Sequence, residues 1–302
     1  MTQVLARTEV VSLSERFGAD LVRMKLVTAI DRLRQQLAAG VPVVSRADAG
    51  NLVIRWLVAD MDRFLLQAPR RVINATGVLL HTGLGRAPLA DAARLAMSDA
   101  AGTCLLEADP DSGERSYRGF QTDDLLRSIT GCEGSLIVNN NAGATLLVLQ
   151  ALCHGREVLI SRGQLVEIGG SFRLPEIFQT AGVILREVGT TNRTHLRDYE
   201  SAINDRTVAI LRVHASNFRI VGFTAEPSTM ELAGLAQSRG VMMFDDIGSG
   251  QLFPAPVLQA FQEPDFRTSI AQGADLVLGS GDKLMGGPQA GIIAGRAPLI
   301  SI

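Results

Sequence analysis

Apolar residues recur at helical spacing in the first part of the chain. Between residues 11 and 37 they fall three and four positions apart, which is typical of an amphipathic helix. Gly40 and Pro42 interrupt the pattern, and a second helical pattern runs over residues 47–66. We therefore expect residues 1–69 to form a small helical unit.

After residue 133 the pattern changes to short apolar runs that alternate with helical segments. Such alternation predicts an α/β fold, with a doubly wound, mostly parallel sheet covered by helices on both faces. We expect this larger domain to span residues 70–302. The predicted strands are residues 135–138, 157–161, 183–188, 208–214, 241–245 and 274–278. The predicted helices include residues 145–152, 197–203 and 230–239.

Polar residues gather where these strands end, and ligands of open parallel sheets bind beyond the carboxyl ends of the strands. Residues 139–142, Asn-Asn-Asn-Ala, join a strand to an apolar helix, where backbone amides and the helix dipole favour a phosphate. An ordinary turn with a helix cap is the alternative, although three consecutive asparagines exceed what a cap needs. The other polar groups are residues 161–164, 214–217, 245–246 and 280–283.

One lysine stands out in the composition. The chain has 29 basic residues, yet only Lys25 and Lys283 are lysines. Arginine keeps its proton in proteins, whereas a buried lysine can lose it and act as a nucleophile. Lys283 lies among glycines just past a predicted buried strand, so it is a candidate for Schiff-base chemistry. A surface lysine in a turn would give the same local pattern.

Bulk composition narrows the classes of function. The formal net charge of −2 does not indicate a polyanion partner for the whole chain. Residues 1–73 hold 11 basic and 7 acidic residues, which is compatible with nucleic-acid contact, although a solvated helical face is the simpler interpretation. Cys104, Cys132 and Cys153 form no C-x-x-C pair, which favours a reducing compartment. No membrane span or signal peptide is visible, so we expect a cytoplasmic protein.

An anion-binding turn at one strand end, a carboxylate at a later one and a lysine at a later one still match the needs of pyridoxal phosphate. The carboxylate would keep the pyridine nitrogen protonated, the lysine would form the Schiff base, and the turn would hold the phosphate. A metal site at Asp245 and Asp246 is the competing interpretation. No histidine lies within ligand spacing of these two acids, so we expect no metal.

Six longer motifs carry a resemblance to a known family. They are Ile73–Ala87, Ile137–Ala142, Ser161–Arg173, Glu187–His195, Val213–Phe218 and Ser280–Gly291. From about residue 11 onward the chain resembles bacterial selenocysteine synthase, the L-seryl-tRNA(Sec) selenium transferase. The resemblance implies the aspartate-aminotransferase-like (fold type I) class and bound pyridoxal 5'-phosphate. It also implies a helical N-terminal region that binds tRNA, and a ring-like homo-oligomer with sites at subunit interfaces.

The resemblance also implies roles for individual residues. Lys283 matches the Schiff-base lysine, and Asp246 matches the partner of the pyridine nitrogen. Arg86 matches an arginine near the selenium donor and joins Lys283 as a catalytic candidate. The expected cofactor-binding residues are Lys283, Asp246, Asn139, Asn140, Asn141, Ala142, Ser280 and His214.

The implied reaction converts seryl-tRNA(Sec) to selenocysteinyl-tRNA(Sec): water is eliminated, and selenium is added from selenophosphate. Because the chain stops at Ile302, soon after Lys283, we expect the small C-terminal domain of the family to be missing. Two other hypotheses stay open. One is a pyridoxal phosphate-dependent lyase that acts on a small amino acid. The other is a truncated, non-catalytic remnant that still binds the cofactor.

Overall fold

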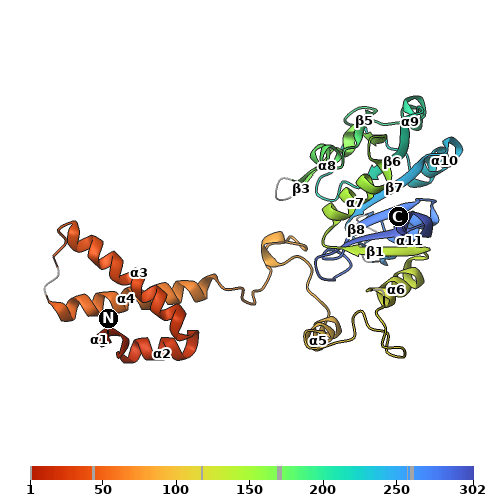
Figure 1. The fold of residues 1–302 in the computed structure, drawn as a ribbon. Coiled ribbons are helices and arrows are strands. Elements are labelled where there is room, and N and C mark those ends of the chain that lie inside the picture. The colour runs from red at the N-terminus through yellow and green to blue at the C-terminus, as the bar shows by residue number, and fades with distance from the viewer. Residues whose placement is uncertain (1, 43–44, 117, 169–171, 257, 259–261) are drawn as a thin grey trace. The chain divides into compact units, whose positions relative to one another are not determined.

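The computed structural model describes residues 2–42, 45–116, 118–168, 172–256, 258 and 262–302. The contacts between its residues divide the chain into two compact units, Met1–Ile73 and Asn74–Ile302 (Figure 1). The boundary lies a few residues beyond the predicted one at 69/70. Each unit has its own buried core, so the two are described separately.

The first unit is helical. Its elements are α1 (Thr2–Leu5), α2 (Thr8–Phe17), α3 (Ala19–Ala38) and α4 (Arg46–Gln67). The single helix predicted over residues 11–37 is wrong, because Gly18 takes a φ of 87° and separates α2 from α3. The second predicted helix is confirmed as α4, which begins after Ser45, whose hydroxyl accepts a hydrogen bond from the Asp48 amide at 3.1 Å.

Apolar side chains of α3 and α4 form the core of the first unit. Val22, Leu26, Leu57 and Met61 are completely shielded from solvent. Their spacing along each helix puts them on one face, so packing of these two faces stabilises helices that would be marginal alone. None of the described helices is long and apolar enough to cross a membrane.

The second unit contains a seven-stranded sheet within the described residues, in the order β1-β9-β8-β7-β6-β2-β5. Strand β9 runs antiparallel to both of its neighbours, and the other pairings are parallel. The strands are β1 (Gly134–Val138), β2 (Glu157–Ser161), β5 (Ile184–Val188), β6 (Thr207–Val213), β7 (Met242–Gly248), β8 (Leu276–Ser280) and β9 (Gly291–Gly295). A separate two-stranded ribbon pairs β3 (Glu167–Ile168) with β4 (Phe172–Arg173).

The predicted doubly wound, mostly parallel sheet is confirmed, and each of the six predicted strands corresponds to an observed one. Strand β9 was missed, since its Gly-Ile-Ile-Ala-Gly sequence continues the glycine-rich stretch after Lys283. Helices cover both faces of the sheet, and this burial explains the mainly apolar runs of β2, β6, β8 and β9. In β2, for example, Val158 and Ile160 face one core and Leu159 faces the other.

Helices cover the sheet on both faces. Apolar side chains of α7 (Asn141–Cys153) and α8 (Leu174–Thr180) pack in one core. Those of α6 (Phe120–Thr130), α9 (Leu196–Ala202), α10 (Thr229–Arg239) and α11 (Phe266–Ala271) pack in the other. The remaining helices of this unit are α5 (Asp91–Ala100) and α12 (Ala297–Ile300), with short 3-10 turns at η1 (Thr82–Leu84) and η2 (Arg162–Gln164).

Gly250 is the point of closest approach between the segment after β7 and the end of β8. It has a φ of 75°, and a Cβ atom there would lie 1.8 Å from the Ser280 carbonyl oxygen. No side chain fits at that distance, so only glycine lets the two strand ends meet. The sequence Asp-Ile-Gly-Ser-Gly thus fixes the spacing between β7 and the lysine turn.

We expect Gly250→Ala to lower the free energy of unfolding by about 3 kcal/mol or more, because strain is added to a steric clash. Gly240→Ala is the matched control: Gly240 has a φ of 67°, but its Cβ would meet nothing within 4 Å. The Gly240→Ala variant should lose only about 1 kcal/mol of its free energy of unfolding. Urea unfolding followed by circular dichroism measures both. Equal losses would show that the close approach is not a constraint.

Candidate active site

Lys283 lies in the turn that follows β8. The Gly286 amide donates to the Lys283 carbonyl at 3.0 Å, and the Gly287 amide donates to the Gly281 carbonyl at 2.8 Å. These bonds close the turn before the chain enters β9. Burial lowers the pKa of the Lys283 amine, and the charge of Arg86 lowers it further, against the opposing charges of nearby carboxylates. The turn therefore holds an amine that loses its proton more easily than an ordinary lysine.

Asp246, near the end of β7, is a buried carboxylate that receives three hydrogen bonds. Asn141 Nδ2 donates to Oδ1 at 2.8 Å, Thr145 Oγ1 donates to Oδ2 at 3.0 Å, and the Gly248 amide donates to Oδ1 at 3.0 Å. Burial raises the pKa of Asp246, whereas these hydrogen bonds and the charge of Lys283 act in the opposite direction.

The two asparagines at the start of α7 are already engaged. Asn140 caps the helix, accepting a hydrogen bond from the Gly143 amide at 2.7 Å, and Asn141 donates to Asp246. These bonds use the Oδ1 acceptor of Asn140 and the Nδ2 donor of Asn141, and whether either residue binds a phosphate stays a prediction. Asn139 is exposed and Ala142 is partly buried. The backbone amides of the first turn remain as the anion-binding feature.

Arg86 reaches the lysine turn from a distant part of the sequence. Its Nη1 lies 2.6 Å from Asp282 Oδ2, and the Ala87 amide donates to the Asp282 carbonyl at 3.3 Å. Arg86 has a φ of 62°, which is uncommon for a residue with a side chain. The structure therefore brings Arg86 next to Lys283 but pairs it with a carboxylate.

His214 follows β6 and Ser280 ends β8, the two strands that flank β7. The His214 amide donates to the Asp246 carbonyl at 2.9 Å, and its Nε2 lies 3.3 Å from Glu263 Oε2. Ser280 is buried, with its carbonyl against Gly250. Glu263 and Thr145 were not among the predicted residues, because no spacing in the sequence connects either one with Asp246 or His214.

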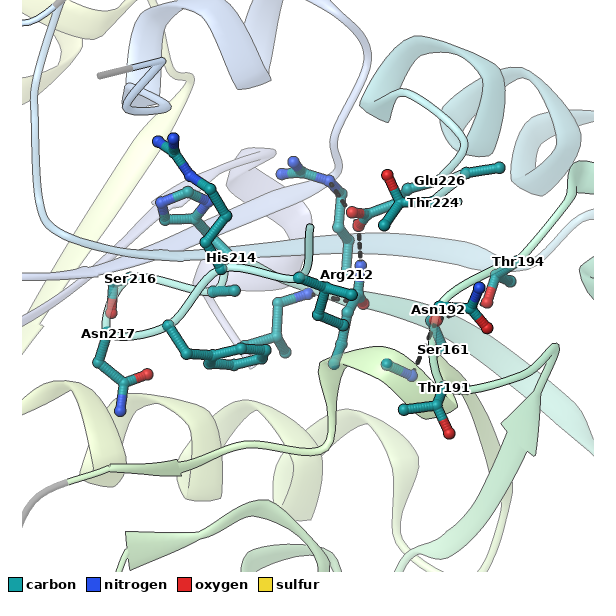
Figure 2. Close-up of a pocket in the computed structure, with 18 of the residues that line it drawn as sticks. Ser161, Thr191, Asn192, Thr194, Arg212, His214, Ser216, Asn217, Thr224 and Glu226 are labelled. Atoms are coloured by element: carbon teal, nitrogen blue, oxygen red, sulfur yellow. Dashed lines mark hydrogen bonds and ion pairs between the residues drawn. The ribbon is translucent and has the colours of Figure 1, made fainter. Parts of the chain in front are cut away.

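A polar cavity of about 530 Å³ opens beside this group, over the ends of β2 and β6. His214, Ser216 and Asn217 line one part of it, and Thr191 and Asn192 line another (Figure 2). Of the expected cofactor-binding residues, only His214 is in its lining. The cavity and the lysine turn thus adjoin each other at His214.

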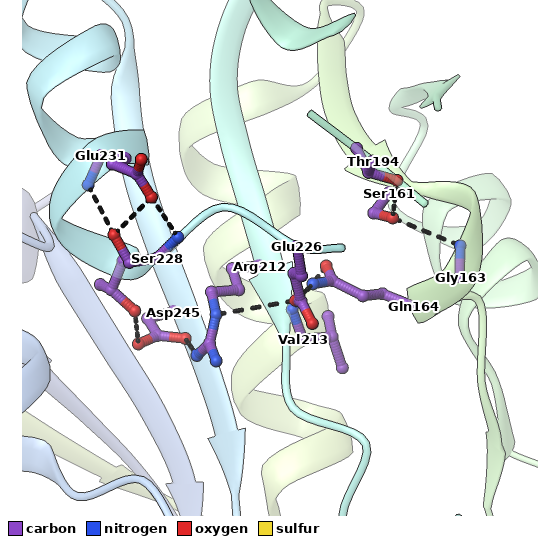
Figure 3. A network of polar contacts seen from close by, with 11 residues as sticks. Ser161, Gly163, Gln164, Thr194, Arg212, Val213, Glu226, Ser228, Glu231 and Asp245 are labelled. Atoms are coloured by element: carbon purple, nitrogen blue, oxygen red, sulfur yellow. Dashed lines mark hydrogen bonds and ion pairs between the residues drawn. The ribbon is translucent and has the colours of Figure 1, made fainter. Parts of the chain in front are cut away.

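The opposite face of β7 carries a separate polar network (Figure 3). Asp245 Oδ1 lies 2.8 Å from Arg212 Nη1, and Thr229 Oγ1 donates to Asp245 Oδ2 at 3.3 Å. Consecutive strand residues point to opposite faces, so Asp245 and Asp246 do not converge on one ligand. Among the described residues, no group of three or more His, Cys, Asp or Glu side chains could hold a metal ion.

Comparison with known proteins gives the family. The profile of the L-seryl-tRNA selenium transferase family matches residues 72–302. The chain belongs to this family. It is 48% identical to the L-seryl-tRNA(Sec) selenium transferase of Solidesulfovibrio magneticus over 286 residues, which is 93% of this chain and 60% of the relative. With the enzyme of the same name from Geobacter sulfurreducens it shares 45% identity over 295 residues, or 97% of this chain and 64% of the relative.

The resemblance expected from the motifs is thereby confirmed, although residues 169–171 of one motif lie outside the described residues. The chain spans about 60% of the length of these curated relatives.

Solved structures show the same fold. A D-glucosaminate-6-phosphate ammonia-lyase superposes with a TM-score of 0.61 at 24% identity, covering 79% of this chain and 62% of that one. A SepCysS–SepCysE N-terminal domain complex superposes with a TM-score of 0.54 at 13% identity, covering 79% and 60%. Both superpositions show that this chain shares the α/β fold of these two proteins, with a mostly parallel sheet covered by helices.

The lowered pKa of Lys283 is testable with acetic anhydride, which modifies only unprotonated amines. After hydroxylamine treatment to remove bound aldehydes, Lys283 should reach its half-maximal rate at a lower pH than a lysine peptide in the same sample. Arg86→Gln should move this midpoint upward, since the arginine charge lowers the pKa. Mass spectrometry of the peptides gives both profiles. A midpoint at or above that of the peptide would contradict the burial argument.

Proposed function

We propose that this chain carries the cofactor-binding part of a selenium transferase that converts seryl-tRNA(Sec) to selenocysteinyl-tRNA(Sec). The observation that carries the proposal is the position of a buried lysine of lowered pKa after β8, near enough to the buried Asp246 carboxylate on the neighbouring strand β7 for the two charges to act on each other's pKa. Membership of the selenium transferase family supports the same reaction.

The residues present fit pyridoxal 5'-phosphate. Asp246 suits the ring nitrogen, Lys283 suits the aldehyde, and the first turn of α7, with Ser280, suits the phosphate. Two polar atoms in this region, Asn141 Oδ1 and Ser249 Oγ, are buried and without a hydrogen-bond partner in the described structure. Buried polar atoms are costly unless paired, so these two favour a polar occupant.

When bound, the cofactor supplies a ring that withdraws electrons from the Cα atom of the serine. Lys283 is suited to removing the Cα proton, because its lowered pKa leaves the amine unprotonated near neutral pH more often than an ordinary lysine. Asp246 is held in place by its three hydrogen bonds and would face the ring nitrogen, whose proton would favour the ionised carboxylate. The backbone of His214 is bonded to that of Asp246.

Arg86 is the residue that we assign to selenophosphate. Its guanidinium carries a fixed charge and suits an oxyanion, and its pairing with Asp282 keeps it beside Lys283. An anion would have to compete with Asp282 or share Arg86 with it. Selenophosphate would thus be held next to the Lys283 amine, which would remove the Cα proton.

The N-terminal unit is the part that we assign to tRNA, on the basis of its excess of basic over acidic residues. We also propose a homo-oligomer in the cytoplasm. Leu79, Leu95 and Leu105 are about 70% exposed, and a second copy would cover such apolar side chains.

Reconstitution with pyridoxal phosphate should give a visible absorption band, and borohydride should then fix one cofactor to Lys283. Lys283→Ala should abolish both signals. Lys25→Ala removes the only other lysine and is the matched control, so it should leave both unchanged. Peptide mapping identifies the modified residue. An adduct on Lys25, or none, would refute the cofactor assignment.

Gel shifts with the full chain test the substrate class. We expect binding of seryl-tRNA(Sec), with affinity falling roughly tenfold or more between 50 and 200 mM salt as phosphate contacts are screened. Another seryl-tRNA is the control and should bind more weakly. Fixation of the cofactor to Lys283 without any tRNA binding would favour a lyase that acts on a small free amino acid.

A further inference from the structure

The contact between Glu263 and His214 is the feature of the site that the proposed function leaves unexplained. Glu263 Oε2 lies 3.3 Å from His214 Nε2, and both side chains are about 20% exposed. The two atoms are shielded from solvent, and neither has a hydrogen-bond partner in the described part of the chain, so their approach is a close ion-pair contact rather than an aligned hydrogen bond. Each is therefore placed to compensate for the burial of the other.

The position of this pair connects it with the lysine site. The backbone of His214 is bonded to the Asp246 carbonyl, and the charges of Glu263 and Lys283 act on each other's pKa. The pKa of Glu263 is lowered, with the interaction with His214 as the largest cause. Glu263 thus remains ionised beside the imidazole and the amine.

The backbone next to Glu263 is unusual. Among the described residues, a positive φ at a residue other than glycine occurs at Arg86, with 62°, and at Gln262, with 55°. Arg86 places its charged side chain against the lysine turn. Gln262 directly precedes Glu263, whose carboxylate contacts His214. Such conformations cost free energy and are concentrated at functional sites.

We propose that Glu263 is a positioning residue that acts through His214. Its carboxylate accepts the proton on Nε2, which selects one tautomer of the neutral imidazole and fixes the ring at the edge of the lysine site. The fixed ring then contributes to holding the cofactor. This inference rests on the proposed pyridoxal phosphate site and extends it by a residue outside the family motifs identified in the sequence.

A double-mutant cycle on the full chain tests the proposal, with the dissociation constant of pyridoxal phosphate as the readout. Glu263→Ala should weaken binding about tenfold in the wild-type background, as for loss of a charge-assisted hydrogen bond. In the His214→Ala background the same change should weaken cofactor binding less than about twofold, because the imidazole that Glu263 contacts is absent. Equal losses in both backgrounds, or no loss in the wild type, would overturn the proposal.

Two further variants sharpen the cycle. Glu263→Gln keeps an acceptor oxygen but loses the charge, so it should recover part of the affinity. It also carries the test if Glu263→Ala does not fold. Glu226→Gln is the matched control: Glu226 lines the same cavity but interacts with Gln164 and Arg212 rather than with His214, and it should bind the cofactor as the wild type does.

Nitrogen-15 NMR of the histidine rings gives a second readout that does not need the cofactor. The chain has only four histidines, and His214→Ala identifies the signal of interest. His214 should show one tautomer, protonated on Nε2, and Glu263→Ala should give a mixture. An unchanged ring signal would overturn the proposal. If the wild type binds no cofactor at Lys283, the proposed function fails, while this measurement still decides whether Glu263 positions His214.

Discussion

The buried carboxylate of Asp246 is the constraint on which the arrangement of the site depends. A charge inside a sheet costs several kcal/mol unless hydrogen bonds and an opposite charge compensate for it. Asn141 and Thr145 supply two of these bonds from positions four residues apart, so the first turns of α7 must lie against β7 in one register. The same register brings the N-terminus of α7, with its free backbone amides, to the edge of the sheet.

The order of the strands brings the other residues of the candidate site close to Asp246. Strands β7 and β8 are neighbours, so Lys283 emerges next to Asp246, and Gly250 allows the two strand ends to approach. The loop that carries Arg86 then pairs with the turn through Asp282. Burial and the arginine charge lower the lysine pKa, while the carboxylates limit that effect. Opposing effects therefore set the pKa of the Lys283 amine. An amine whose pKa is lowered toward the working pH is suited to accept and return a proton.

Alternation along β7 separates two acids that are adjacent in the sequence. Asp246 faces α7 and the proposed cofactor site, whereas Asp245 faces the other core and is paired with Arg212. The paired carboxylate and guanidinium stabilise the centre of the sheet without entering the proposed chemistry. A similar division holds in the cavity, where Glu226 contacts Gln164 and Glu263 contacts His214.

The sequence by itself determined six of the strands, the helix that begins in the asparagine turn, the rarity of lysine and the family, since periodicity, composition and long motifs are local properties. It did not reveal β9, whose apolar residues are enclosed by glycines. Only the tertiary structure decided that Thr145 supports Asp246 and that Glu263 contacts His214. These contacts join residues far apart in the chain, and their formation depends on strand order and on which face each side chain occupies.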